Sequence, residues 1–405
     1  MYNIRTAILI LSLFVHIRFI TPLVIIRPFD LLTIIIFLFL LSINKDKKEK
    51  SPPGFYYLLP FLIFHSFSAL LVGSNNFFRE TIQVILIIMF AYVISRLRFK
   101  IDYKKVIYYL LIGSTLLMLL VIMWHINNNI WAGWKKLPDA RIIFTVMSIF
   151  LFSYLNTIKI HPEQKFKIIM IFIGFFTILI FSGERKAILI FLFLLLIYYT
   201  YGYTFRTVVG VIAAYYILFF IANNTGNEYV ARILNSLIEI TESVEIDFIL
   251  QTGSNVETSS YSNMQRIFAF NVSKELFSEN PIIGIGTNNF ISILNDRYSS
   301  LPNYLRGGIH SEFLRILVEN GLIGLFLYLL IWFKSWTRTK KILIMANRNG
   351  LIKNKQIIFL LYGIYLTLAL YVGTEASSNR SFIILVLISI LPDYLINHFK
   401  KDISR

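Results

Sequence analysis

The chain has 405 residues, of which 57% are hydrophobic and only 15% charged, and its mean hydropathy is +0.68. A soluble chain of this length needs far more polar surface, so the composition excludes a soluble globular protein and predicts a polytopic membrane protein. The net charge of +17 fits either a nucleic-acid binder or a membrane protein with basic loops on one side. The absence of cysteine excludes disulfides and thiolate metal sites.

Apolar segments long enough to span or nearly span a bilayer recur along the whole chain. Their ranges are approximately 7–26, 30–44, 54–74, 80–95, 106–125, 142–158, 167–182, 187–201, 207–222, 312–333, 356–374 and 381–397. Only helices and closed barrels satisfy the backbone in lipid, and these segments lack the alternation typical of barrel strands. The sequence therefore predicts an all-α protein with about twelve transmembrane helices.

The basic residues are distributed unevenly between the two sides of this topology. With the N-terminus inside, 24 lysines and arginines fall on the inner side and 13 on the outer side, and Arg18 and Arg315 fall within spans. This asymmetry predicts that both chain ends are cytoplasmic. It also accounts for the basic net charge without a nucleic-acid partner.

One outer loop, residues 223–311, is much longer than the others and divides the chain into residues 1–222, 223–311 and 312–405. The loop contains weak amphipathic patterns, which predict short helices, and with Glu312 its net charge is −5. Loops of this length within compact folds usually have a function. We therefore expect functional residues in this loop and at its edges.

The stretch "IHSEFLRILVENGLIG", residues 309–324, leads from this loop into the tenth span. If the helix begins near His310, its 3.6-residue period places Gly321 and Gly324 on the same face, beneath the histidine, where they allow another backbone or a lipid chain to approach. On the opposite face, Glu312, Arg315 and Glu319 have the spacing of an ion-pair ladder, for which we favour a structural role that ties this helix to a neighbour. By itself, His310 is more simply interpreted as an interfacial or helix-capping residue.

Three stretches together resemble a known family. The first is His310 and Ser311, then nine residues, then Gly321-Leu322-Ile323-Gly324. The second is "ENPIIGIGTNNF", with Pro281, Gly284, Gly286 and Phe290, preceded fifteen residues earlier by Arg266. The third is "FSGERKAIL", which contains Arg185 at the outer end of the seventh span. These patterns resemble the bacterial O-antigen ligase and O-antigen polymerase superfamily.

The resemblance implies a glycosyltransferase of GT-C-like architecture in the bacterial inner membrane, with its active site facing the periplasm. Such an enzyme transfers a glycan from a polyprenyl pyrophosphate carrier to an acceptor hydroxyl, with inversion and without a cofactor. Arg185 and Arg266 would hold the pyrophosphate, because guanidinium groups bind phosphate oxygens in a fork. His310 would accept the proton of the acceptor hydroxyl, a contribution typically of roughly 10²–10⁴-fold in rate.

Other residues are weaker candidates for substrate binding. They are Arg141, Arg315, Glu312, Gly284, Gly286, Gly321 and Gly324. A metal site is not expected, because the first outer loop is only "RPFD" and the "EID" stretch of the long loop has no histidine at ligand spacing.

Three functions remain open on this evidence. A polymerase joins lipid-linked repeat units to one another, and a ligase joins the finished glycan to lipid A-core. A transporter of the same lipid-linked sugar is the third, but transporters place their sites at the midplane, whereas here polar residues gather at the outer rim. We favour the polymerase, with the lipid-linked oligosaccharide, an acceptor glycolipid, membrane lipids and a chain-length regulator protein as its partners.

Overall fold

The computed structural model describes residues 19–20, 25–26, 28–43, 53–73, 77–96, 148, 190–195, 197, 261–302, 305–352, 357, 361, 363–374 and 378–403. Within these ranges the regular secondary structure is helical apart from one short pair of strands. The helices are α2 (Pro28–Ile43), α3 (Pro53–Leu71), α4 (Phe77–Arg96), α12 (Tyr261–Glu279), α13 (Phe290–Arg297), α14 (Glu312–Arg348), α16 (Ile364–Thr374) and α17 (Ser378–Ile403). The predicted helical class is therefore confirmed for the described part of the chain.

The prediction of one continuous helix over residues 7–26 is wrong at its end. There β1 (Phe19–Ile20) and β2 (Ile25–Ile26) pair antiparallel, with Phe19 opposite Ile26 and Ile20 opposite Ile25. The intervening sequence includes Thr21-Pro22. Proline disfavours the helical conformation of the residue before it, and β-branched isoleucines suit strands, which agrees with the strands on either side of this sequence.

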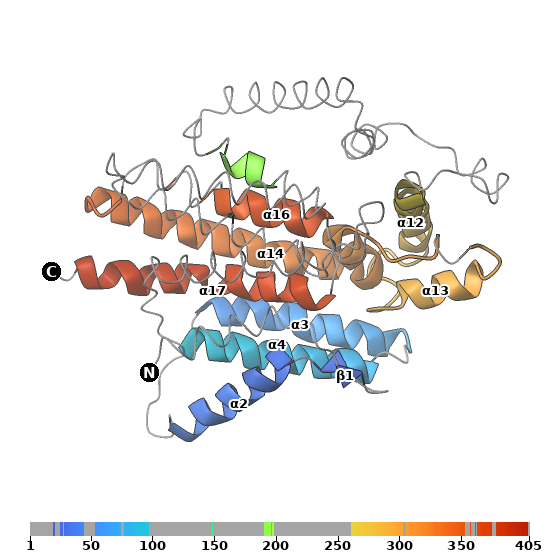
Figure 1. Cartoon of the computed structure of the whole chain (residues 1–405), viewed down its shortest axis with the longest axis horizontal. Coiled ribbons are helices and arrows are strands. Elements are labelled where there is room, and N and C mark those ends of the chain that lie inside the picture. The colour runs from blue at the N-terminus through green and yellow to red at the C-terminus, as the bar shows by residue number, and fades with distance from the viewer. Residues whose placement is uncertain are drawn as a thin grey trace, which may run out of the picture.

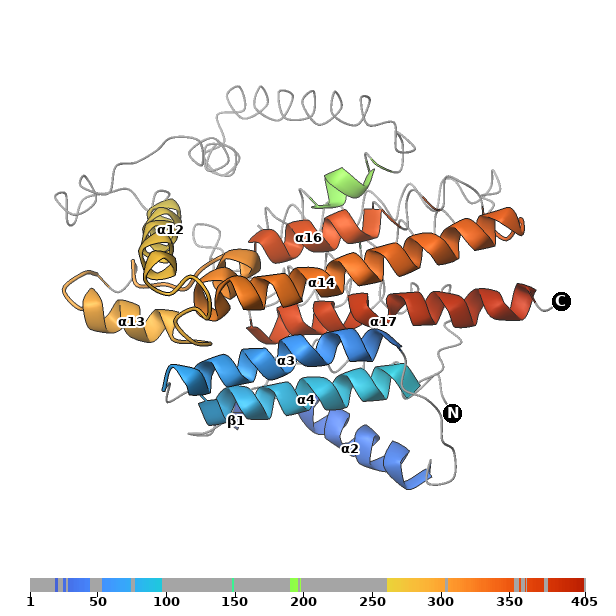
Figure 2. The ribbon, with the colours of Figure 1, turned by 180° about the vertical axis from the view of Figure 1, so that it is seen from behind.

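The long helices lie side by side as a bundle, with α14 packed against α3, α16 and α17, and with α4 packed against α2 and α3 (Figure 1). Helices α12 and α13 lie beyond the end of the bundle where α14 begins, and the C-terminus lies at the opposite end (Figures 1 and 2). Two described helices are long and apolar enough to cross a membrane, Gly54–Leu71 and Glu312–Arg348. The total of about twelve spans and the sidedness of the loops stay predictions, since several predicted segments lie outside the described residues.

Helix α14 extends well beyond its predicted boundary. Residues 334–348, expected in an inner loop, continue the helix to Arg348, so it has 37 residues. At 1.5 Å per residue its length is about 55 Å, which exceeds a hydrocarbon core of about 30 Å. The helix therefore has room for a membrane-spanning part and a basic extension beyond it.

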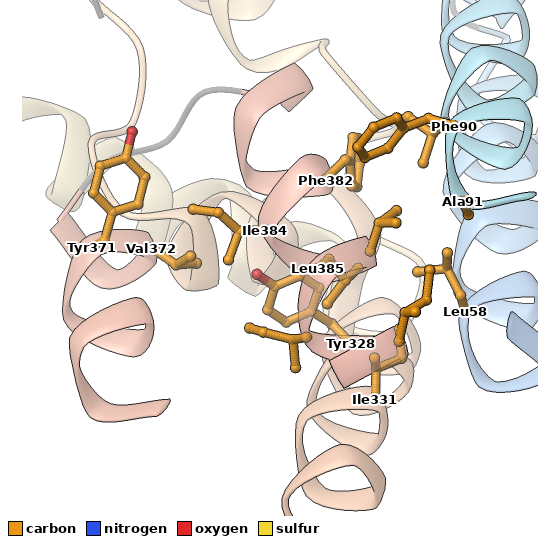
Figure 3. Packing of buried hydrophobic residues seen from close by; sticks show 14 of the residues in the cluster. Leu58, Phe90, Ala91, Tyr328, Ile331, Tyr371, Val372, Phe382, Ile384 and Leu385 are labelled. Atoms are coloured by element: carbon orange, nitrogen blue, oxygen red, sulfur yellow. The ribbon is translucent and has the colours of Figure 1, made fainter. Parts of the chain in front are cut away.

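Aromatic and aliphatic side chains from several helices form the centre of the bundle. Phe61 of α3 packs edge-on against Tyr328 of α14 at a ring-centroid distance of 5.3 Å and lies 5.9 Å from Phe382 of α17. Figure 3 shows Tyr328 and Leu385 among the neighbouring core residues of the same bundle. In contrast, Phe326 and Phe333 of α14 are more than 60% exposed, as expected of side chains that face lipid.

Candidate functional site

A break in α14 is the central feature of the end of the bundle where α12 and α13 lie (Figure 1). Gly321 has φ 64° and ψ −166°, which interrupts the helix within its first ten residues. In a continuous helix, the carbonyl oxygens of Val318 and Glu319 would accept from the N–H groups of Leu322 and Ile323. The break leaves these four backbone groups in need of other partners.

The loop between α12 and α13 supplies those partners. The bonds run from Ile285 N to Val318 O (3.0 Å), Gly286 N to Glu319 O (2.9 Å), Leu322 N to Pro281 O (2.9 Å) and Ile323 N to Ile282 O (3.3 Å). Residues 281–286, called here the docking loop, thus replace two helical bonds of α14 by four bonds to a distant segment. The "PIIGIG" motif and the "GLIG" motif are the two halves of one structural unit.

Two glycines make this close contact possible. At Gly284, with φ 81°, an added Cβ would lie 2.5 Å from the carbonyl carbon and oxygen of Glu319. At Gly321, an added Cβ would overlap the carbonyl oxygen of Ile282. Both positions also have a positive φ, which side-chain-bearing residues rarely adopt. The prediction that glycine at 321 admits another backbone is confirmed, and the backbone is that of the docking loop.

The predicted helical phase between His310 and the glycines does not hold. The helix begins at Glu312, and Ser311 is its N-cap, with the Ser311 hydroxyl accepting from Leu314 N at 3.4 Å. His310 therefore precedes the helix, and the break at Gly321 ends the regular phase before Gly324. At Gly324, an added Cβ would overlap the side chain of Asn320 from the preceding turn.

A small hydrophobic cluster joins the segment before His310 to α12. Ile309 and Leu305 pack with Phe268 of α12, and the cluster continues through Ile285 of the docking loop and Val318 of α14. Arg266, half-buried, lies on α12 two residues before Phe268. The structure thus holds the segments that contain Arg266 and His310 in one folded unit, which is called here the outer unit.

The charged residues at the start of α14 form the ladder that their spacing predicts. Arg315 donates from Nε to Oε2 of Glu312 at 3.0 Å and from Nη1 to Oε2 of Glu319 at 2.9 Å, and its Nη2 contacts Oε1 of Glu312. All three side chains are buried. All of these ion pairs lie within α14, so they do not themselves join α14 to a neighbouring helix. Roles for Arg315 and Glu312 in substrate binding stay predictions.

Behind the docking loop lies a buried polar cluster that the sequence analysis did not identify. Asn320 of α14 donates from Nδ2 to Ser68 Oγ at 2.6 Å and to Thr287 Oγ1 at 2.9 Å, and its Oδ1 lies 3.0 Å from His65 Nδ1. On the other side of the ring, His65 Nε2 faces Oε2 of Glu80 at 3.7 Å. A polar pattern within a span, "FHSFS" at residues 64–68, was the available signal.

Outside the membrane-spanning helices, α12 and α13 are joined by a forked ion pair. Arg297 donates from Nη1 to Oε1 of Glu279 at 2.6 Å and from Nη2 to Oε2 at 2.8 Å. These hydrogen bonds from Arg297 lower the pKa of the Glu279 carboxyl. Burial, followed by the hydrogen bond that its hydroxyl donates to Glu275, raises the pKa of Tyr298. The fork links the last residue of α12 to the last residue of α13.

Two of the predicted site residues, Arg185 and Arg141, lie outside the described residues. Among the described residues there is no group of three or more histidine, aspartate or glutamate side chains placed to hold a metal ion. The structure brings Gly284 and Gly321 into contact and places Gly286 against α14, and it places Arg266 and His310 in the outer unit.

Comparison with known proteins agrees with the sequence motifs. Residues 169–329 match the family model described as O-Antigen ligase, and this range includes Arg185, Arg266 and His310. No curated protein matches the chain. The match spans the docking loop and its binding site on α14, the same elements that carry the sequence motifs. This match supports the resemblance of the chain to the O-antigen polymerase and ligase superfamily.

Proposed function

We propose that the protein is an O-antigen polymerase of the bacterial inner membrane. It transfers a glycan from a polyprenyl pyrophosphate carrier to a hydroxyl of a second lipid-linked repeat unit at the periplasmic face. Enzymes of the superfamily are glycosyltransferase-like polymerases and ligases, so glycan transfer is the common chemistry. The observation that carries the proposal is the family match over residues 169–329, which includes the motif residues of the outer unit.

In this proposal His310 is the general base. It stands immediately before the N-cap of α14, at the end of the bundle from which the outer unit projects (Figure 2). An imidazole can take a proton from a sugar hydroxyl near neutral pH, which makes the oxygen a better nucleophile. Attack opposite the leaving pyrophosphate inverts the anomeric carbon.

Arg266 and Arg185 bind the leaving group. Negative charge increases on the pyrophosphate as its bond to the sugar breaks, and guanidinium groups stabilise this charge through paired hydrogen bonds. No step in this scheme requires a metal ion or another cofactor. Partners that follow from it are the lipid-linked oligosaccharide, an acceptor glycolipid and a protein that regulates chain length.

A ligase that transfers the finished glycan to lipid A-core is the second candidate. The description of the matching family favours it, since that description is O-Antigen ligase. The two functions share the donor and differ in the acceptor. The match gives no support to a transporter of the lipid-linked sugar.

The test uses purified full-length protein and the lipid-linked repeat unit alone, with His310→Ala alongside and products separated on a gel. We expect a ladder of lengthening products, which His310→Ala abolishes while its yield and folding stay those of the unmodified protein. Product formed only after lipid A-core is added would identify a ligase. A full rate in purified His310→Ala would remove His310 from the mechanism.

A further inference from the structure

The buried polar cluster contains an ionisable pair for which the proposed reaction has no role. His65 of α3 and Glu80 of α4 are completely buried, and their facing atoms, Nε2 and Oε2, are 3.7 Å apart. Neither atom has a hydrogen-bond partner in the described part of the chain. Buried ionisable groups are costly in a membrane helix, so their protonation state has structural consequences.

The hydrogen bonds around the pair determine which protons are present. Thr287 Oγ1 donates to the carbonyl oxygen of His65 at 2.7 Å, and the hydroxyls of Ser68 and Thr287 are 2.8 Å apart. The Thr287 hydroxyl proton goes to this carbonyl oxygen, and the Ser68 hydroxyl proton goes either to Thr287 or to the same carbonyl oxygen, 3.0 Å from Ser68 Oγ, so neither hydroxyl has a proton left. The Asn320 atom close to both oxygens must therefore be the amide nitrogen, which supplies two protons.

This orientation of Asn320 fixes the histidine tautomer. The remaining amide atom, Oδ1, can only accept, so His65 Nδ1, 3.0 Å away, must carry a proton and donate it. A neutral ring with its proton on Nδ1 has a bare lone pair on Nε2. That lone pair would face an ionised Glu80 oxygen, which is an unfavourable contact in a buried site. One additional proton between Nε2 and Oε2 removes the conflict.

The other oxygen of Glu80 connects the pair to the segment after the docking loop. Asn288 Nδ2 donates to Glu80 Oε1, and Asn288 has φ 57°, a backbone conformation rare for residues other than glycine. Asn288 directly follows Thr287, which bonds to α3, and its chain continues into α13. The pair thus contacts α14 through Asn320, and it contacts residues 281–289, called here the docked segment, through Thr287 and Asn288.

We infer that His65 and Glu80 form a buried dyad that holds one shared proton and positions the docked segment and the start of α14 for the reaction. The dyad is a positioning element and not a catalytic one, since it acts through Asn288 and Asn320. Other charges near it come from α14, where Arg315 and Glu319 form an ion pair of 2.9 Å. From α17 the facing group is the ring of Phe382, 4.8 Å from that of His65.

The sign of the pH dependence follows from the proton count. While the dyad holds this proton, docking of the loop against α14 is favoured. When rising pH removes it, the lone pair of Nε2 and the carboxylate repel each other and docking weakens. The dyad therefore contributes an alkaline decline in turnover at saturating donor, a prediction that rests on the proposed function.

The first measurement does not depend on that function. Nitrogen NMR of full-length protein labelled with ¹⁵N-histidine, with the His65 signals assigned by their loss in His65→Gln, reports which ring nitrogens carry protons. We expect a protonated Nδ1 in His65 at neutral pH. A ring with an unprotonated Nδ1 and a protonated Nε2 would overturn the inference.

The second measurement uses turnover with the lipid-linked repeat unit as donor and acceptor. In Glu80→Gln the side-chain amide can donate permanently to Nε2, so turnover should stay within about twofold of wild type, as expected when the number of hydrogen bonds is kept. Its alkaline decline should disappear. Glu80→Leu should lower turnover by on the order of 10²-fold with a smaller change in KM, because misplacement of the site reduces the rate.

Gln83, buried one turn further along α4, provides the matched control. We expect Gln83→Leu to keep both the turnover and the pH profile of wild type. If Glu80→Gln retained the alkaline decline, or lost turnover as fully as Glu80→Leu, the shared proton would be wrong. If wild type showed no transfer at all, the proposed function would fail and the NMR result would still decide the protonation of the dyad.

Discussion

The peptide N–H of Gly286 donates to the carbonyl oxygen of Glu319 at 2.9 Å, although the two residues belong to different segments of the sequence motif. In a continuous α14 this carbonyl would be bonded within the helix. The contact explains why a glycine-rich turn and a glycine-broken helix occur in the same chain. Docking of the loop should therefore be sensitive to substitutions both in the loop itself and in the first turns of α14.

Gly321→Ala should be strongly destabilising. Alanine would have to adopt φ 64° and its Cβ would overlap the Ile282 carbonyl oxygen, so the loop must move and leave backbone groups unbonded. We expect a loss of several kcal/mol, since each unsatisfied buried polar group costs about 1–3 kcal/mol. Thermal unfolding in detergent, followed by intrinsic fluorescence, measures the change.

Gly350→Ala is the control for this variant. Gly350 also has a positive φ, 70°, but no atom of the described residues lies within 4 Å of an added Cβ. It should show only the backbone cost, about 1 kcal/mol. Equal losses in the two variants would mean that loop docking contributes nothing beyond backbone strain.

Arg315→Met should destabilise the outer end of α14, because it leaves the buried carboxylates of Glu312 and Glu319 without their cation. Breaking a buried ion pair from one side costs about 3–5 kcal/mol. Replacing both glutamates by glutamine in the same chain should recover part of the loss. Arg348→Met, at the exposed far end of α14, should leave the unfolding temperature nearly unchanged. An equal loss of stability in this variant would mean that the buried ion pairs are not the cause of the effect.

Arg266→Lys tests the pyrophosphate clamp. An ammonium group keeps the charge but cannot reproduce the paired hydrogen bonds of a guanidinium. We expect turnover at saturating donor to fall by at least tenfold, which corresponds to about 1.4 kcal/mol of transition-state stabilisation. Arg306→Lys, in the same outer unit, is the comparison, and wild-type turnover in Arg266→Lys would exclude Arg266 from the clamp.

The fork between Arg297 and Glu279 gives a pH prediction for the outer unit. Because its pKa is lowered in the folded protein, Glu279 contributes stability above the ordinary glutamate value of 4.5, and the contribution is lost as pH falls through the lowered value. The protection factors of α13 in hydrogen exchange, which are corrected for the intrinsic pH dependence of amide exchange, should therefore fall on acidification. In Glu279→Gln they should already be lower at neutral pH and depend less on acid, and an unchanged acid response would refute this origin.

Much of the site was predictable because its signals are local. The spacing of Glu312, Arg315 and Glu319 is enough to predict their ion pairs, and the glycines at 284, 286 and 321 indicate an unusual backbone. The partners of those glycines were not predictable, since the contact joins segments more than thirty residues apart in sequence. The β1–β2 pair was missed because the surrounding sequence is as apolar as a spanning helix.

The dyad of His65 and Glu80 could not be predicted for a different reason. Each residue taken alone is an isolated polar side chain in or beside an apolar segment, and nothing in the sequence links residue 65 to residues 80, 287 and 320. Only the packing of α3, α4 and α14 brings them together. Polar networks in membrane proteins are therefore less visible in sequence than ion-pair ladders along one helix.

The exchange of backbone bonds at Gly321 gives the first turns of α14 two sets of neighbours. Val318 and Glu319 are bonded to the docking loop. Ile316 and Phe313, in contrast, pack in the bundle core, where the ring of Phe313 meets that of Tyr328 beyond the break. The break therefore joins a distant loop to the hydrogen-bond ladder of a helix that hydropathy alone describes as a single straight rod, and it leaves both sides of the break anchored in the same core.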